Sequence, residues 1–156
     1  MKKIFFIALL VVFAGCTESE TEKIEPLSFT ESQAITLAID DEYRAKAAYG
    51  AAISEFGLVN PFANILEAEE LHIQALEALF VKYSIVIPEN SWRSGDNKFS
   101  SLKDACEQAV QAELRNIELY ENLKTRTSRQ DLITVFDSVQ GASRNHLSSF
   151  QNCAVR

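Results

Sequence analysis

A carboxylate and an imidazole lie three residues apart in the apolar stripe of one predicted helix. Residues 65–80, ILEAEELHIQALEALF, have the spacing of an amphipathic helix, with Ile65 and Leu76 on the apolar face. Glu69 and His72 fall in the middle of that face, where leucine or valine is expected. Glutamate and histidine are ligands that iron, manganese and zinc accept. The stretch is therefore a candidate for one wall of a buried metal site.

Three further stretches show the same kind of interruption. Each has apolar residues at helical spacing, and each stripe is broken by polar side chains near its centre. The interruptions are Glu42 in residues 35–56, Glu113 and Asn116 in residues 102–123, and Ser143 and His146 in residues 132–153. The residues that lie off the first stripe include Asp40, Asp41, Arg44 and Glu55. The chain has only two histidines, and both fall on these stripes.

Four helices are expected to position these groups. The start signals are Thr30 with Gln33, Ser101 with Asp104, and Thr127 with Gln130, which have the spacing of N-terminal caps, and Pro61, which suits a first turn. The predicted helices cover about residues 30–56, 61–83, 101–126 and 127–153.

The connection between the second and third helices decides the topology. Residues 84–99 show no helical period. The second helix is about 34 Å long, and the connection, if extended, reaches roughly 50 Å. It is therefore long enough to return along the whole bundle. We predict an all-α four-helix bundle with one long crossover between helices two and three, in preference to an up-down-up-down bundle with a looped-out excursion.

Two cysteines share a register in the second helical hairpin. If the third and fourth helices pair so that Glu113 lies opposite His146, Cys106 also lies level with Cys153. The N-terminal segment, described below, predicts export to an oxidising compartment, where a disulfide persists. The sequence therefore predicts a Cys106–Cys153 disulfide, with two buried thiols as the alternative.

The polar groups of the four helices meet near mid-bundle. In the first hairpin, Glu42 lies level with Glu69 and His72. Three carboxylates within about 5 Å repel each other by roughly 3 kcal/mol per pair, and burial costs several more per ion. A domain is stable by only about 5–15 kcal/mol in all. Bound divalent cations would relieve this repulsion fully, so a metal site is predicted; a hydrated polar core is the alternative.

Three segments carry a resemblance to a known family. DDEYRA (40–45), NPFANILEAEELHIQALEALFVKY (60–83) and ASRNHLSSFQNC (142–153) resemble the family catalogued as domain of unknown function 2202. One glutamate on helices one and three, with Glu-x-x-His on helix two and a histidine on helix four, resembles the carboxylate-bridged di-metal pattern of ferritin-like proteins. The resemblance covers about residues 30–153. It implies a ferritin-like fold and a dinuclear metal site without an established activity.

The resemblance also implies a role for each ligand. The implied metal ligands are Glu42, Glu69, His72, Glu113 and His146, with Glu69 as the bridge between two ions. Ser143 occupies the place of a second bridging glutamate, so the second ion should bind more weakly. Asn116, one turn from Glu113, is a possible source of an extra oxygen. The expected cofactor is divalent metal, with iron preferred and manganese or zinc as alternatives.

Three functions are compatible with such a site. One is an iron centre that oxidises Fe(II) with oxygen or peroxide. The second is a metal-binding or sensing module without turnover, and the third is a structural or partner-binding bundle with a degenerate site. Tyr49 and Tyr120, each two turns from a predicted ligand, are candidates to relay electrons, with simple core packing as the alternative.

The N-terminus has the features of an export signal. Lys2 and Lys3 precede an apolar run that ends before Gly15 and Cys16. The segment VFAGC resembles a bacterial lipobox, which implies that residues 1–15 are removed and that Cys16 carries lipid. Residues 16–29 read as a flexible tether and residues 30–153 as the bundle. We expect an exported, lipid-anchored protein of the cell envelope, with ordinary secretion as the alternative.

The charge of the chain restricts its partners. Its formal net charge is -7, and removal of residues 1–15 deletes two lysines and no acidic residue, which gives -9. Nucleic acids and anionic lipid surfaces repel such a protein. The expected partners are therefore metal ions, oxygen or peroxide, and a membrane reached through the lipid anchor rather than through surface charge.

Overall fold

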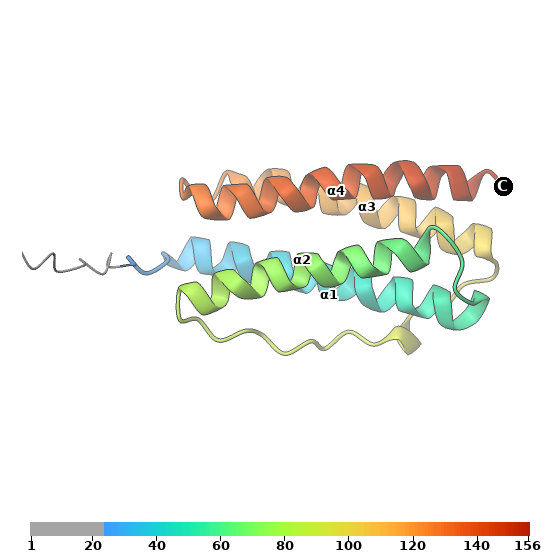
Figure 1. The fold of residues 1–156 in the computed structure, drawn as a ribbon, viewed down its shortest axis with the longest axis horizontal. Coiled ribbons are helices and arrows are strands. Elements are labelled where there is room, and N and C mark those ends of the chain that lie inside the picture. The colour runs from blue at the N-terminus through green and yellow to red at the C-terminus, as the bar shows by residue number, and fades with distance from the viewer. Residues whose placement is uncertain (1–23) are drawn as a thin grey trace, which may run out of the picture.

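Four α-helices lie side by side in the computed structural model, which describes residues 24–156 (Figure 1). The helices are α1 (Phe29–Phe56), α2 (Phe62–Lys82), α3 (Leu102–Lys124) and α4 (Gln130–Ala154), with a short 3-10 turn, η1 (Ser94–Asp96), between α2 and α3. The expected signal sequence and Cys16 lie outside the described residues. Within residues 24–156, no helix is long and apolar enough to cross a membrane.

The long crossover is confirmed. After α2 the chain returns along the length of the bundle before α3 begins, so α2 and α3 run in the same direction (Figure 1). α1 packs against α2 and α3, and α4 packs against α3 and α2. The returning segment is held to α1, where Trp92 Nε1 donates to Asp40 Oδ1 at 2.9 Å and the Arg44 guanidinium lies over the Trp92 ring.

The predicted start of α1 is wrong by two residues. Ser28, not Thr30, is the N-cap, and the capping box pairs it with Glu31 rather than Gln33. The Ser28 N–H donates to Glu31 Oε2 at 2.9 Å, and the Glu31 N–H donates to Ser28 Oγ at 3.2 Å. Thr127 of the α3–α4 connection also donates to the Glu31 carboxylate, at 2.8 Å. The start of α1 thus follows the local Ser-x-x-Glu spacing of residues 28–31, and the contact from Thr127 adds to it.

The start of α3 is confirmed and that of α4 is not. Ser101 Oγ accepts a hydrogen bond from the Asp104 N–H at 3.1 Å, as expected of an N-cap. α4 begins after Arg129, which makes no side-chain cap, so the predicted pairing of Thr127 with Gln130 is wrong. The Thr127 hydroxyl is occupied instead by Glu31 and by the Arg129 N–H.

The apolar core falls into two clusters, one on each side of a polar layer. One cluster includes Leu76, Phe80 and Phe136. The other includes Phe62 and Phe150, whose ring centroids are 4.9 Å apart. The large aromatic side chains at both ends make the helices rigid supports for the side chains between them.

The Cys106–Cys153 disulfide is also confirmed, and it joins α3 to α4 with a Cα–Cα distance of 5.8 Å. Replacing both cysteines by serine should lower the free energy of unfolding by roughly 4 kcal/mol, because the bond closes a long loop in the unfolded chain. Denaturant unfolding of the parent and the double variant measures this difference. Thiol counting on the unreduced, unfolded protein provides the check, and two free thiols other than Cys16 would contradict the assignment.

Candidate metal centre

The polar layer brings together the five predicted ligands, which come from all four helices. They form two triads that share one carboxylate: Glu42, Glu69 and His72, and Glu69, Glu113 and His146. Within each triad, the potential ligand atoms all lie within 4.8 Å of one another. The three glutamates are at most 2% exposed. The structure thus places three carboxylates and two imidazoles in one water-poor layer.

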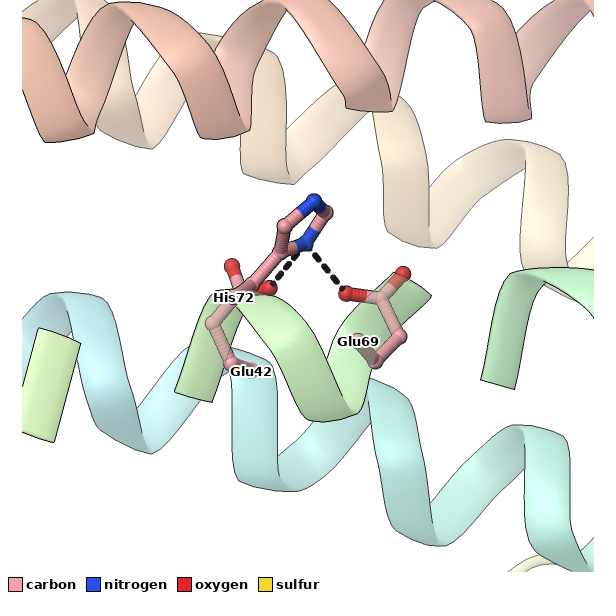
Figure 2. Close-up of side chains that lie close together, drawn as sticks. All are labelled: Glu42, Glu69 and His72. Atoms are coloured by element: carbon pink, nitrogen blue, oxygen red, sulfur yellow. Dashed lines mark hydrogen bonds and ion pairs between the residues drawn. The ribbon is translucent and has the colours of Figure 1, made fainter. Parts of the chain in front are cut away.

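The first triad is centred on the imidazole of His72. Its Nδ1 lies 3.0 Å from Glu42 Oε2 and 2.9 Å from Glu69 Oε2, so the ring nitrogen points between two carboxylates (Figure 2). Glu42 comes from α1, whereas Glu69 and His72 lie one turn apart on α2. This convergence of one nitrogen and two oxygens is the arrangement that a single divalent ion can occupy.

The second triad is centred on His146, and Glu69 faces it with its other oxygen. His146 Nδ1 lies 3.2 Å from Glu69 Oε1 and 3.5 Å from Glu113 Oε1, within ion-pair distance. Neither contact has hydrogen-bond geometry, and this nitrogen is the one buried side-chain nitrogen or oxygen within residues 24–156 without a hydrogen-bond partner. Glu69 therefore directs one oxygen toward each imidazole, as a bridging carboxylate does.

Two buried tyrosines hold the outer carboxylates of the triads. The Tyr49 hydroxyl of α1 donates to Glu113 Oε1 of α3 at 2.6 Å. Reciprocally, the Tyr120 hydroxyl of α3 donates to Glu42 Oε1 of α1 at 2.9 Å. Each tyrosine thus fixes a carboxylate on the opposite helix. Hydrogen bonds of this kind orient a metal ligand and are part of a built site.

The two hairpins repeat the same pattern, with two linked exceptions. The corresponding pairs are Glu42 and Glu113, Tyr49 and Tyr120, Glu69 and Ser143, and His72 and His146. Three residues after the glutamates, Ala45 corresponds to Asn116. The first hairpin therefore combines a large Glu69 with a small Ala45, and the second combines a small Ser143 with a large Asn116.

Ser143 is too short to fill the place that Glu69 takes in the first hairpin, and the longer Asn116 side chain fills the space beside it. Ser143 Oγ donates to Asn116 Oδ1 at 2.6 Å, and Asn116 Nδ2 donates to both Glu42 Oε1 and Asp41 Oδ2 at 2.9 Å. Two carboxylates facing Nδ2 require this orientation of the amide, because an oxygen there would meet only acceptors. With its oxygen engaged by Ser143, Asn116 positions Glu42 rather than supplying a ligand. The expectation that it lends an oxygen gains no support from these contacts.

Asp41 belongs to this network, although the stripe analysis places it off the buried face. It is 7% exposed, pairs with Arg44, and accepts from Asn116. α1 packs against two helices, so a second face of α1 is buried against α3. The alanines at 45 and 48, four and seven residues after Asp41, were the sequence feature that could have indicated this second face.

The electrostatics of the layer follow from burial and close contact. Burial raises the pKa of Glu42, whereas the contacts of Glu69 with His146 and His72 outweigh its burial and lower its pKa. Burial alone would lower the pKa of both histidines. The carboxylates of Glu42 and Glu69 instead raise the pKa of His72 to about 10, and those of Glu113 and Glu69 raise the pKa of His146 to about 9. The metal-free layer therefore holds two imidazolium rings among its carboxylates at neutral pH.

This donor set fits divalent metal. Carboxylate oxygens and imidazole nitrogens together suit iron, manganese and zinc. Protons satisfy the contacts of the first triad, but they leave His146 Nδ1 without a hydrogen bond. If each triad held one ion, the two ions together would be bound by all five side chains, and Glu69 would bind both ions.

The comparisons with known proteins agree with the fold. A crystal structure of the hypothetical protein MJ0754 from Methanococcus jannaschii DSM 2661 matches with a TM-score of 0.74 and 22% sequence identity, over 85% of this chain and 83% of that one. At this identity the likeness shows the fold alone. A search of curated proteins gave no match. The profile described as an uncharacterized protein domain, DUF2202, matches residues 31–154, and the chain therefore belongs to the DUF2202 family.

Proposed function

We propose that this protein is a ferritin-like metal protein that binds two divalent ions, with iron as the preferred metal. The observation that carries the proposal is the position of Glu69, which directs one oxygen toward each histidine. Because this side chain belongs to both triads, it can join two ions that have otherwise separate ligands. The four-helix arrangement with its long crossover supports the ferritin-like assignment.

The chain's own residues prepare the centre for reactive metal. Tyr49 and Tyr120 hold Glu113 and Glu42 in place, and an apolar cluster packs on each side of the layer. Ser143 and the Asn116 side chain bonded to it place no carboxylate on that side of the layer. A bound ion would therefore have one protein ligand fewer there, which leaves a coordination position for oxygen or peroxide. Ferrous ions bound here would supply electrons for the reduction of oxygen or peroxide.

The reaction is tested by loading the protein with ferrous iron without oxygen and then adding oxygen or peroxide. Rapid, stoichiometric oxidation of iron with a new absorption band is the expected result. Stable binding of metal without a redox change would favour the non-catalytic metal-binding alternative. Absence of metal binding would favour a structural bundle with a degenerate site.

Metal binding should strengthen as the pH rises. Each imidazole must lose a proton before its nitrogen binds an ion, and the raised pKa values of His72 and His146 keep these protons in place at neutral pH. The dissociation constant of each ion should therefore fall at least about tenfold per pH unit below these pKa values. Burial also raises the pKa of Glu42 to about 8, so this carboxyl must lose its proton as well. Calorimetry in two buffers of different ionisation enthalpy should record release of about two to three protons per chain at neutral pH. An affinity that does not change with pH would contradict the assignment of the histidines.

The site of action is proposed to be a bacterial membrane surface in the cell envelope. The lipobox-like VFAGC and the polar residues that follow it support attachment through Cys16. Cys16→Ser should move the protein from the membrane fraction to the soluble fraction or leave it unprocessed. Unchanged membrane association and processing in this variant would count against a lipid anchor.

A further inference from the structure

A cavity of about 250 Å³ lies between α1 and α3, beside the metal centre. Glu113 and Asn116 line it where it meets the polar layer, and Phe62 and Phe99 line its apolar part. Engineered apolar cavities of about 150 Å³ bind benzene. This cavity therefore has room for a larger organic molecule.

Small side chains on the two helices create the space. Ala48 of α1 and Ala109 and Ala112 of α3 are among the alanines that line the cavity. The Phe62 ring packs against Tyr49, which also lines the cavity, and against Phe150, with centroid distances of 5.9 and 4.9 Å. Alanine methyl groups and aromatic rings thus form the apolar part of the lining, which favours an apolar ligand body. Polar side chains, among them the carboxylates of Asp41 and Glu113, form the rest.

An arginine that makes no ion pair with the described part of the chain lies at the rim of this cavity. Arg44 and Arg115 both line it. Arg44 is engaged by Asp41 and by the ring of Trp92. Arg115 is exposed and makes no ion pair with any of residues 24–156. A free guanidinium beside an apolar cavity is suited to the two oxygens of a carboxylate.

We propose that the cavity binds a small monocarboxylate with an apolar body. The carboxylate group lies on Arg115, and the apolar body lies along the alanines toward Phe62 and Phe99. Such binding does not require metal. A role for the bound molecule as a substrate, beside Glu113, rests on the proposed function.

Octanoate is a suitable probe, and 1-octanol is its uncharged counterpart. Calorimetric titration of the parent should show saturable binding of octanoate and weaker binding of octanol. Arg115→Gln should weaken octanoate binding about tenfold and leave octanol binding unchanged. Ala48→Leu and Ala112→Leu fill the cavity from opposite walls and should weaken both probes. The matched controls are Arg126→Gln, at an exposed arginine, and Ala63→Leu, at a half-buried alanine that does not line the cavity.

Several outcomes would overturn this inference. The parent could bind no octanoate, or Arg126→Gln could weaken binding as much as Arg115→Gln, which would indicate only non-specific attraction. If octanol bound as tightly as octanoate, the proposed recognition of a carboxylate group by Arg115 would be wrong. Circular dichroism of each variant confirms that it folds. Titration of both metal-free and metal-loaded protein separates the two proposals, because octanoate binding without metal binding would reject the proposed function alone.

Discussion

Glu69→Ala should abolish binding of the pair of ions, with the affinity of each position falling by more than about a hundredfold. Outer-sphere partners of metal ligands are themselves worth about 10–100-fold in affinity. Glu69 touches both histidines directly and is the one carboxylate shared by the two triads. Its loss therefore removes a ligand from both positions and also the bridge between them. Anaerobic titration of the parent and variant with Fe(II) or Mn(II) measures the effect.

The neighbouring residue offers a matched control. Glu70 is exposed and pairs with Lys46 at 3.1 Å on the surface. Exposed ion pairs contribute only about 0–1 kcal/mol, so Glu70→Ala should keep both the fold and the metal affinity of the parent. Equal metal binding by the Glu69→Ala and Glu70→Ala proteins would show that the buried carboxylate has no part in holding metal.

A second bridging carboxylate can be restored only with two substitutions. Ser143 is hydrogen-bonded to Asn116, which fills the adjacent space, whereas Ala45 stands at the corresponding position of the first hairpin. Ser143→Glu alone should destabilise the metal-free protein by about 3 kcal/mol or more, because it overpacks the layer and buries another charge. Ser143→Glu with Asn116→Ala recreates the combination of Glu69 and Ala45. This double variant should bind the weaker ion about tenfold more tightly than the parent does.

Two measurements separate the effects of the two substitutions: thermal unfolding with chelator, and metal titration. Both are made on the parent, the two single variants and the double variant. Asn116→Ala is the reference for the loss of the amide, which otherwise donates to Glu42 and Asp41. If Ser143→Glu alone folds as stably as the parent and binds metal as tightly as the double variant, the proposed filling of the space by Asn116 is wrong.

The bundle and its crossover could be predicted because they depend on features that are local in the sequence. Helical periodicity locates the four helices, and the length of residues 84–99 decides between a short turn and a return along the bundle. The register of the second hairpin followed from the spacing of two pairs of residues, and it placed Cys106 correctly beside Cys153. That register and the separate one of the first hairpin, which sets Glu42 level with Glu69 and His72, brought the five polar residues into one layer.

The cap of α1 was also within reach of the sequence, because Ser28 and Glu31 have the Ser-x-x-Glu spacing of a capping box. The remaining features depend on contacts between distant segments. Asp41 is buried because α1 contacts α3 as well as α2, and a single apolar stripe cannot describe two buried faces. The cavity arises where small side chains of two helices meet near the end of the crossover. None of these contacts is visible in the pattern of one helix.

Whether the polar layer is a metal centre is tested most directly by anaerobic titration of the parent with divalent iron, together with its thermal midpoint with excess iron and with chelator. We expect saturation at two ions per chain, because two triads share Glu69. The loaded protein should melt higher by roughly 15–20 °C when free metal is about a hundred times the dissociation constant of each ion. A parent that binds no divalent metal and melts at the same temperature with and without chelator would contradict the assignment of the layer as a metal centre.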